Sequence, residues 1–120
     1  MGIFFGILCL TCFCLLSAKA VTAKLHLKKL DKILLKAHKP VSASLTIACI
    51  IHIFYVVPIL KIRSLIVMIS GIVSVVLMVL LICLCHMIKD RKKKMLWHRI
   101  FTILMAIGII GHFTAGILDI

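Results

Sequence analysis

Four long apolar runs constrain this chain more than any other feature of its sequence. A helix needs about 20 apolar residues to cross the hydrocarbon core of a bilayer, and hydrophobic residues make up 64% of this chain, against about half in soluble domains. The sequence therefore predicts an all-α integral membrane protein, a four-transmembrane-helix bundle forming one membrane domain over residues 1–120. The expected spans cover approximately residues 2–18, 40–60, 64–88 and 98–118.

The first run, residues 2–18, has two interpretations. Ala18-Lys19-Ala20 resembles the small-x-small cleavage site of a signal peptide. No positive charge precedes Ile3, however, and a basic cluster follows the run, which is the charge order of an anchor with its N-terminus outside. We therefore expect an uncleaved helix.

Residues 22–39 interleave leucine with lysine in a helical pattern. Such an amphipathic segment is typical of the cytoplasmic-side membrane interface. Pro40 then either opens the second span as its first helical residue or lies within a helix that runs through it. We expect helical geometry to extend back at least to His38.

Basic residues dominate the charge of the chain: 15 Lys and Arg against three acidic residues give a formal net charge of +12. They lie between the apolar runs, most densely at 19–39 and 89–99. This pattern indicates membrane topology and contact with anionic lipid rather than nucleic acid. We expect a multi-pass protein of the cell membrane with these two basic loops in the cytoplasm and both termini outside.

Four of the six histidines form two pairs with the same spacing. His38 and His52 are fourteen residues apart, as are His98 and His112. Fourteen residues of α-helix turn through nearly four whole turns and rise about 21 Å, so both members of a pair share one helix face. The second and fourth spans run in the same direction in the predicted topology. His38 is then level with His98, and His52 with His112, where ionisable residues are costly and indicate function.

Two imidazoles at one depth are what the iron of a b-type haem needs as axial ligands, so the doubled pair predicts two non-covalent haem b groups. Ligation by two histidines leaves no open iron position, which suits electron transfer. Ala48 and Gly108 precede His52 and His112 by one turn, and their small size leaves room for a macrocycle.

Polar neighbours of these histidines are candidate supporting residues. Ser42 and Thr102 could orient a ligand through its second ring nitrogen, although helix hydroxyls more often bond their own backbone. Lys39 and Arg99 follow the two cytoplasmic-side histidines and are candidate partners of haem propionates. Topology alone would also place cations there.

Two parallel spans separated by one helix, each with two histidines fourteen residues apart, resemble the ferric-reductase-like transmembrane domain. The cytochrome b subunits of respiratory complexes use the same device. The resemblance covers residues 24–118 and implies that His38 and His98 hold the cytoplasmic-side haem, and His52 and His112 the outer one. That family usually has six spans and a cytoplasmic flavin and nicotinamide domain, whereas this chain has four apolar runs and no glycine-rich dinucleotide motif.

The predicted function is transmembrane electron transfer from a cytoplasmic or quinol donor to an extracytoplasmic acceptor. Both must be other molecules, either separate redox proteins or a quinone, and the chain works alone or as a subunit of a larger complex. As an electron-transfer protein or a membrane subunit of an oxidoreductase, it carries no catalytic residue of its own. Two alternatives stay open: transition-metal binding or transport by the same histidines, and an accessory membrane protein with histidines as polar packing residues.

A shift of sixty residues superposes all six histidines, including His26 on His86. The pattern has two explanations, a decayed duplication or a shared constraint on two haem-bearing helices. His26 and His86 precede the cytoplasmic-side histidines by twelve residues, which is about 120° away in helical phase. We expect neither to be a ligand.

The six cysteines lie inside or at the ends of apolar runs, which argues against a disulfide framework. No Cys-x-x-Cys-His motif occurs, so covalent haem attachment is excluded. Cys9 and Cys12 share a helix face and are open to two interpretations, a redox or metal pair and small packing residues. We favour packing residues.

Overall fold

A computed structural model describes residues 1–59, 62 and 64–118, and this part of the chain is helical throughout apart from short turns. Each α-helix of these residues is long and apolar enough to cross a membrane, which confirms the predicted all-α architecture with four helices able to span. The elements are α1 (Gly2–Lys24), α2 (Lys28–Val56), the short 3₁₀ helix η1 (Val57–Ile59), α3 (Leu65–Met87) and α4 (Arg91–Leu118).

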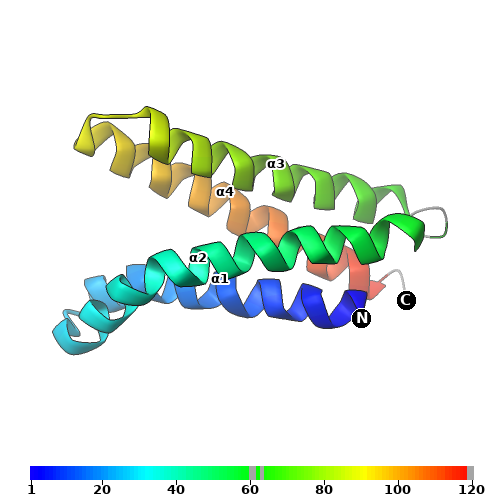
Figure 1. The fold of residues 1–120 in the computed structure, drawn as a ribbon, viewed down its shortest axis with the longest axis horizontal. Coiled ribbons are helices and arrows are strands. Elements are labelled where there is room, and N and C mark those ends of the chain that lie inside the picture. Colours follow the sequence, from blue (N-terminus) through cyan, green and yellow to red (C-terminus); the bar gives the residue numbers. More distant parts are fainter. Residues whose placement is uncertain (60–61, 63, 119–120) are drawn as a thin grey trace. The chain divides into compact units, whose positions relative to one another are not determined.

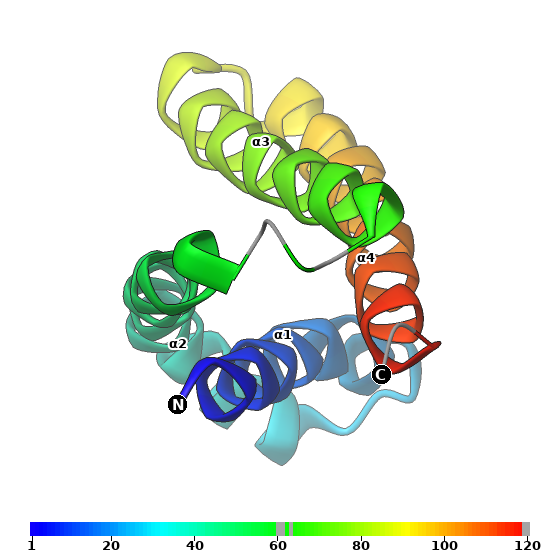
Figure 2. The same cartoon turned by 90° about the vertical axis from the view of Figure 1, so that its right-hand side faces the viewer.

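The helices form two hairpins, with α1 beside α2 and α3 beside α4 (Figures 1 and 2). These hairpins are two compact units, Met1–Ile59 and Leu60–Ile120. Each helix of the second hairpin begins 63 residues after its counterpart in the first. The structural repeat therefore differs by three residues from the sixty-residue shift that superposes the histidines.

Small residues let α1 and α2 pack closely. A Cβ added to Gly2 would lie 3.5 Å from Val56 Cγ2 at the open end of the hairpin. Two layers further along, Cys9 Sγ lies 3.4 Å from Cys49 Sγ. This antiparallel register aligns the start of α1 with the end of α2.

The second hairpin packs in the same manner. A Cβ added to Gly108 of α4 would lie 3.1 Å from Ser74 Oγ of α3. In the adjoining layer, Met78 of α3 and Met105 of α4 are both buried. Ser74 Oγ donates to the carbonyl of Ser70 at 2.9 Å, which satisfies its hydroxyl within its own helix.

The turn between α1 and α2 is a Schellman-type helix end. The Leu27 N–H donates to the Thr22 carbonyl at 3.1 Å, and the His26 N–H to the Ala23 carbonyl at 3.4 Å. His26 has φ 55°, in the left-handed region where glycine is usual. The turn then leads directly into α2.

One helix, α2, contains most of the predicted amphipathic segment, 22–39, together with most of the second span. It runs through Pro40, which has no N–H to donate to the carbonyl of Lys36. Both residues are exposed. As expected, helical geometry includes His38.

The turn between α3 and α4 is shorter than the basic loop expected between the spans 64–88 and 98–118, because α3 ends at Met87 and α4 begins at Arg91. Asp90 Oδ1 accepts from the backbone N–H groups of Lys92 at 2.8 Å and Lys93 at 3.3 Å. Asp90 is thus an N-cap, and the chain after it, from Arg91, is already the first turn of α4.

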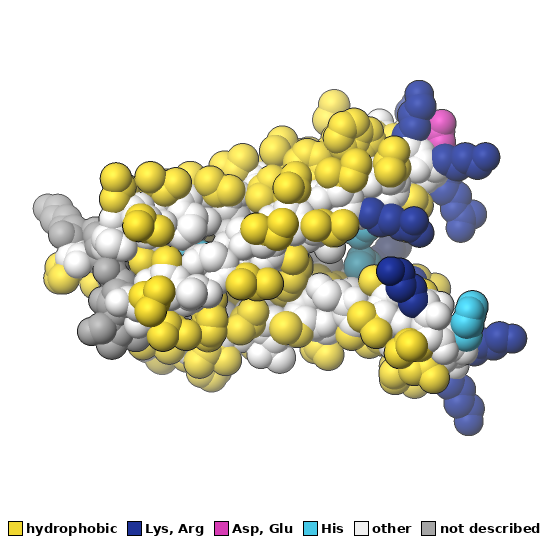
Figure 3. Space-filling view, turned by 180° about the vertical axis from the view of Figure 1, so that it is seen from behind, with side chains coloured by type: hydrophobic (Ala, Val, Ile, Leu, Met, Phe, Trp, Pro, Cys, Tyr) yellow, Lys and Arg dark blue, Asp and Glu magenta, His cyan; other side chains and the backbone are white. Residues whose placement is uncertain are grey.

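Hydrophobic side chains cover the lengths of the helices, and lysine and arginine side chains gather at the closed end of each hairpin (Figure 3). In the first hairpin, Asp31 of α2 offsets part of this charge. Its Oδ1 lies 3.7 Å from Lys19 Nζ and 3.5 Å from the hydroxyl of the buried Thr22. These contacts join α1 to α2 beside their turn.

Candidate functional site

The two histidine pairs lie on uninterrupted helices, His38 and His52 on α2 and His98 and His112 on α4. All four side chains are half-buried. Each predicted ligand pair takes one histidine from each hairpin. Within its own hairpin, the structure places the outer histidine of each helix against the preceding helix.

His52 packs against the start of α1. Its Nδ1 lies 2.9 Å from the carbonyl oxygen of Gly2. Because a carbonyl only accepts, Nδ1 carries the proton and the ring lone pair is on Nε2. Gly6 makes room for this ring, since a Cβ there would lie 3.2 Å from His52 Cε1.

His112 has a parallel arrangement against α3. Its Nδ1 lies 3.1 Å from the Val67 carbonyl oxygen and 3.2 Å from Ser70 Oγ. A Cβ added to Gly71 would lie only 3.0 Å from His112 Cε1. The outer histidine of each hairpin thus donates to a backbone carbonyl and packs over a glycine of the preceding helix.

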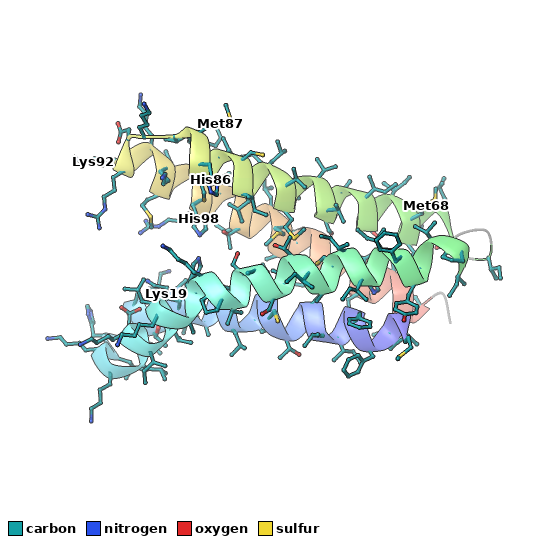
Figure 4. The ribbon with its side chains drawn as sticks, in the orientation of Figure 1. Lys19, Met68, His86, Met87, Lys92 and His98 are labelled. Carbon is teal, nitrogen blue, oxygen red and sulfur yellow. The ribbon has the colours of Figure 1, made fainter. Side chains whose placement is uncertain are left out.

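His38 and His98, which the predicted topology places on the cytoplasmic side, have different surroundings. His98 Nδ1 lies 3.4 Å from Cys85 Sγ, near the α3–α4 turn, where Figure 4 also shows His86. The positive charge of Lys19 on α1 interacts electrostatically with the side chain of His38.

The histidines expected not to be ligands are both exposed. His26 forms the α1–α2 turn through its left-handed backbone. His86 Nδ1 bonds the Ile82 carbonyl of its own helix at 2.9 Å. Both side chains therefore have local surroundings unlike those of the paired histidines.

The small residues expected beside a macrocycle pack between helices. Ala48 is 3% exposed, and Gly108 faces Ser74 of α3. The hydroxyl of Thr102 donates to the His98 carbonyl at 2.7 Å, so it bonds its own helix backbone. Ser42 supplies the backbone carbonyl that accepts from Thr46.

Lys39 and Arg99 are exposed beside the cytoplasmic-side histidines. This exposure leaves both charged groups accessible to an anionic group, as a propionate partner requires. The prediction for these two residues otherwise rests on their positions in the sequence.

The donor chemistry of the outer histidines fits axial ligation of haem. An axial imidazole bonds iron through one nitrogen while the other donates to a carbonyl, a carboxylate or water. His52 and His112 have this tautomer. Among the described residues, no group of three or more His, Cys, Asp or Glu side chains could hold a metal ion; the predicted haem sites use two side chains each.

Sequence reasoning missed the residues that orient the histidines, namely Gly6, Gly71, Ser70 and Cys85. The adjacent small residues Ser70 and Gly71, within an otherwise bulky apolar run, were the available signal. Their role depends on the register between helices, which hydropathy does not specify.

No protein-family model matches the chain, and no curated protein or solved structure matches it. The resemblance to the ferric-reductase-like domain therefore rests on the histidine pattern and stays a prediction. Fold and sequence together describe a multi-pass membrane protein of two helical hairpins, each with a histidine pair on its second helix.

Proposed function

We propose that this protein is a dihaem b-type cytochrome with two histidine ligands per haem that carries electrons across a cell membrane. His38 and His98 hold the cytoplasmic-side haem in this proposal, and His52 and His112 the outer one. The donor is a cytoplasmic redox protein or a quinol, and the acceptor is extracytoplasmic.

The observation that carries the proposal is the equivalent hydrogen bonding of His52 and His112. Each Nδ1–H donates to a backbone carbonyl, of Gly2 and Val67 respectively. Such a bond restricts rotation of the ring and keeps the lone pair on Nε2, the atom that binds iron. The same hydrogen bond occurs in both hairpins. This favours a shared function for His52 and His112 over two unrelated packing contacts.

Haem b supplies a reversible one-electron couple when bound. The histidines of this chain would hold it and set the ring orientation, while the apolar side chains of the spans exclude water from the ligands. Lys39 and Arg99 would attract the propionates at the cytoplasmic end. Two histidine ligands per iron would leave no position open for oxygen, so no oxygen chemistry is expected.

The test is a dithionite-reduced minus oxidised visible spectrum of the full chain purified in detergent from cells that make haem. We expect the narrow bands of six-coordinate, low-spin b-type haem. The variants His52→Ala and His112→Ala should each lose the outer haem and keep the other. The matched controls His26→Ala and His86→Ala, at exposed positions, should keep both. Unchanged haem content in His52→Ala or His112→Ala would contradict the assignment.

A second candidate function is a haem-free accessory membrane protein whose histidines pack the helices together. The close fit of His52 over Gly6 and of His112 over Gly71 favours it. Here the purified chain carries no haem, and His52→Ala lowers its thermal stability without any change in visible absorbance. The spectrum therefore separates the two candidates.

A further inference from the structure

A pair of cysteines outside the histidine sites joins the helices of the first hairpin. Cys9 of α1 and Cys49 of α2 have their sulfur atoms 3.4 Å apart, and both are free thiols with half-buried side chains. Cys12, which shares a face with Cys9, is buried. The sequence alone did not indicate this pair, because forty residues separate Cys9 from Cys49.

The packing around the two thiols explains why they meet. At the next layer towards the open end, Gly6 lies against the ring of His52, and beyond it Gly2 lies against Val56. These glycines bring the helix backbones close together. Closure from 3.4 Å to a disulfide bond of about 2.05 Å thus starts from sulfurs already in contact.

We propose that Cys9 and Cys49 form a reversible disulfide that links α1 to α2, with a lipid-soluble quinone as the oxidant. Two S–H bonds break and one S–S bond forms. The two electrons and two protons released reduce the quinone to a quinol, so the reaction balances. A water-soluble oxidant is less suited, because both cysteines lie well inside apolar helices that could span a membrane.

This inference is independent of haem binding, since none of the proposed ligands takes part. The disulfide closes a loop that contains the α1–α2 turn and constrains the unfolded chain. Oxidation should therefore raise the thermal unfolding midpoint of the first hairpin. The thermal stability of the protein would then depend on the redox state of the membrane quinone.

The experiment uses the full chain in phospholipid vesicles, reduced and then treated with decylubiquinone. Intact-mass measurement after maleimide alkylation in denaturant should show two fewer alkylated thiols per chain. One quinol should form per chain, and peptide mapping should identify a link between Cys9 and Cys49. Reduction with dithiothreitol should restore both thiols.

Cys9→Ser and Cys49→Ser, with Cys49→Ala as a second variant if folding fails by circular dichroism, should lose no thiols to the quinone. Cys14→Ser and Cys83→Ser, at exposed positions, are the matched controls and should behave as the original chain. A link through Cys12, a link between two chains, or no loss of thiols would overturn the proposal. A further contradicting result would be that added Cu(I) protects both thiols from maleimide while the mass of the chain shows no loss of two hydrogens. That result would indicate a two-thiolate metal site in place of a disulfide.

Discussion

At the scale of single residues, the outer histidines depend on glycines of the neighbouring helix. Gly6 and Gly71 provide the space in which the rings of His52 and His112 lie. The imidazole can then reach a backbone carbonyl, a partner that no side-chain substitution removes directly. Substitution of these glycines therefore tests the orientation of each ring.

Gly71→Ala should displace the ring of His112, because the new Cβ would lie 3.0 Å from its Cε1. We expect a loss of about 1 kcal/mol from the weakened hydrogen bond, measured by thermal unfolding in detergent, together with a lower content of outer haem. Gly111→Ala is the matched control on α4, since a Cβ there meets nothing within 4 Å. Equal stability of Gly71→Ala and the control would argue against this packing.

His26 has a separate, backbone role in the α1–α2 turn. Its φ of 55° costs a residue with a side chain roughly 1 kcal/mol that glycine does not incur. His26→Gly should therefore stabilise the chain by about 1 kcal/mol in a thermal unfolding measurement. His86→Gly, in a right-handed helical position, should destabilise it instead. Destabilisation by His26→Gly would show that the turn has another conformation.

At the scale of helices, hydropathy predicts where the chain crosses the membrane, and local caps decide where each helix begins and ends. The apolar runs at 2–18 and 98–118 lie within α1 and α4, but α1 continues to Lys24 and α4 begins at Arg91. The charged residues added at these ends do not contribute to an apolar pattern. The helix ends were therefore the least predictable part of the fold.

Asp90 provides a direct test of a helix end, because it accepts two backbone N–H groups at the start of α4. Asp90→Ala should cost about 1 kcal/mol and speed hydrogen exchange at the amides of Lys92 and Lys93. Asp90→Asn keeps an acceptor oxygen and should retain most of the protection. Identical exchange in Asp90→Ala and the original chain would exclude this cap.

At the scale of the whole molecule, the chain consists of two helical hairpins of the same kind, α1–α2 and α3–α4. The helical register of the histidines followed from their spacing alone, because fourteen residues nearly complete four turns. Their contacts with Gly6, Gly71 and Cys85 did not, since these depend on how two helices are aligned. Each hairpin carries its histidine pair on its second helix.

Membrane topology follows from the repeated hairpin. If all four helices cross, the α1–α2 and α3–α4 turns lie on one side of the membrane, and their basic residues favour the cytoplasmic side. In a chain without its native cysteines, Lys28→Cys and Lys92→Cys should both react with a membrane-impermeant maleimide only from the cytoplasmic side. Labelling of the two positions from opposite sides would exclude four crossings.

Binding of two haems per chain is tested by the haem content of the purified full chain, measured against its protein concentration. We expect two haem b groups per chain, falling to one in His112→Ala and staying at two in His86→Ala. A chain free of haem when produced in cells that make it would contradict the cytochrome proposal and leave the histidines as packing residues of a membrane protein.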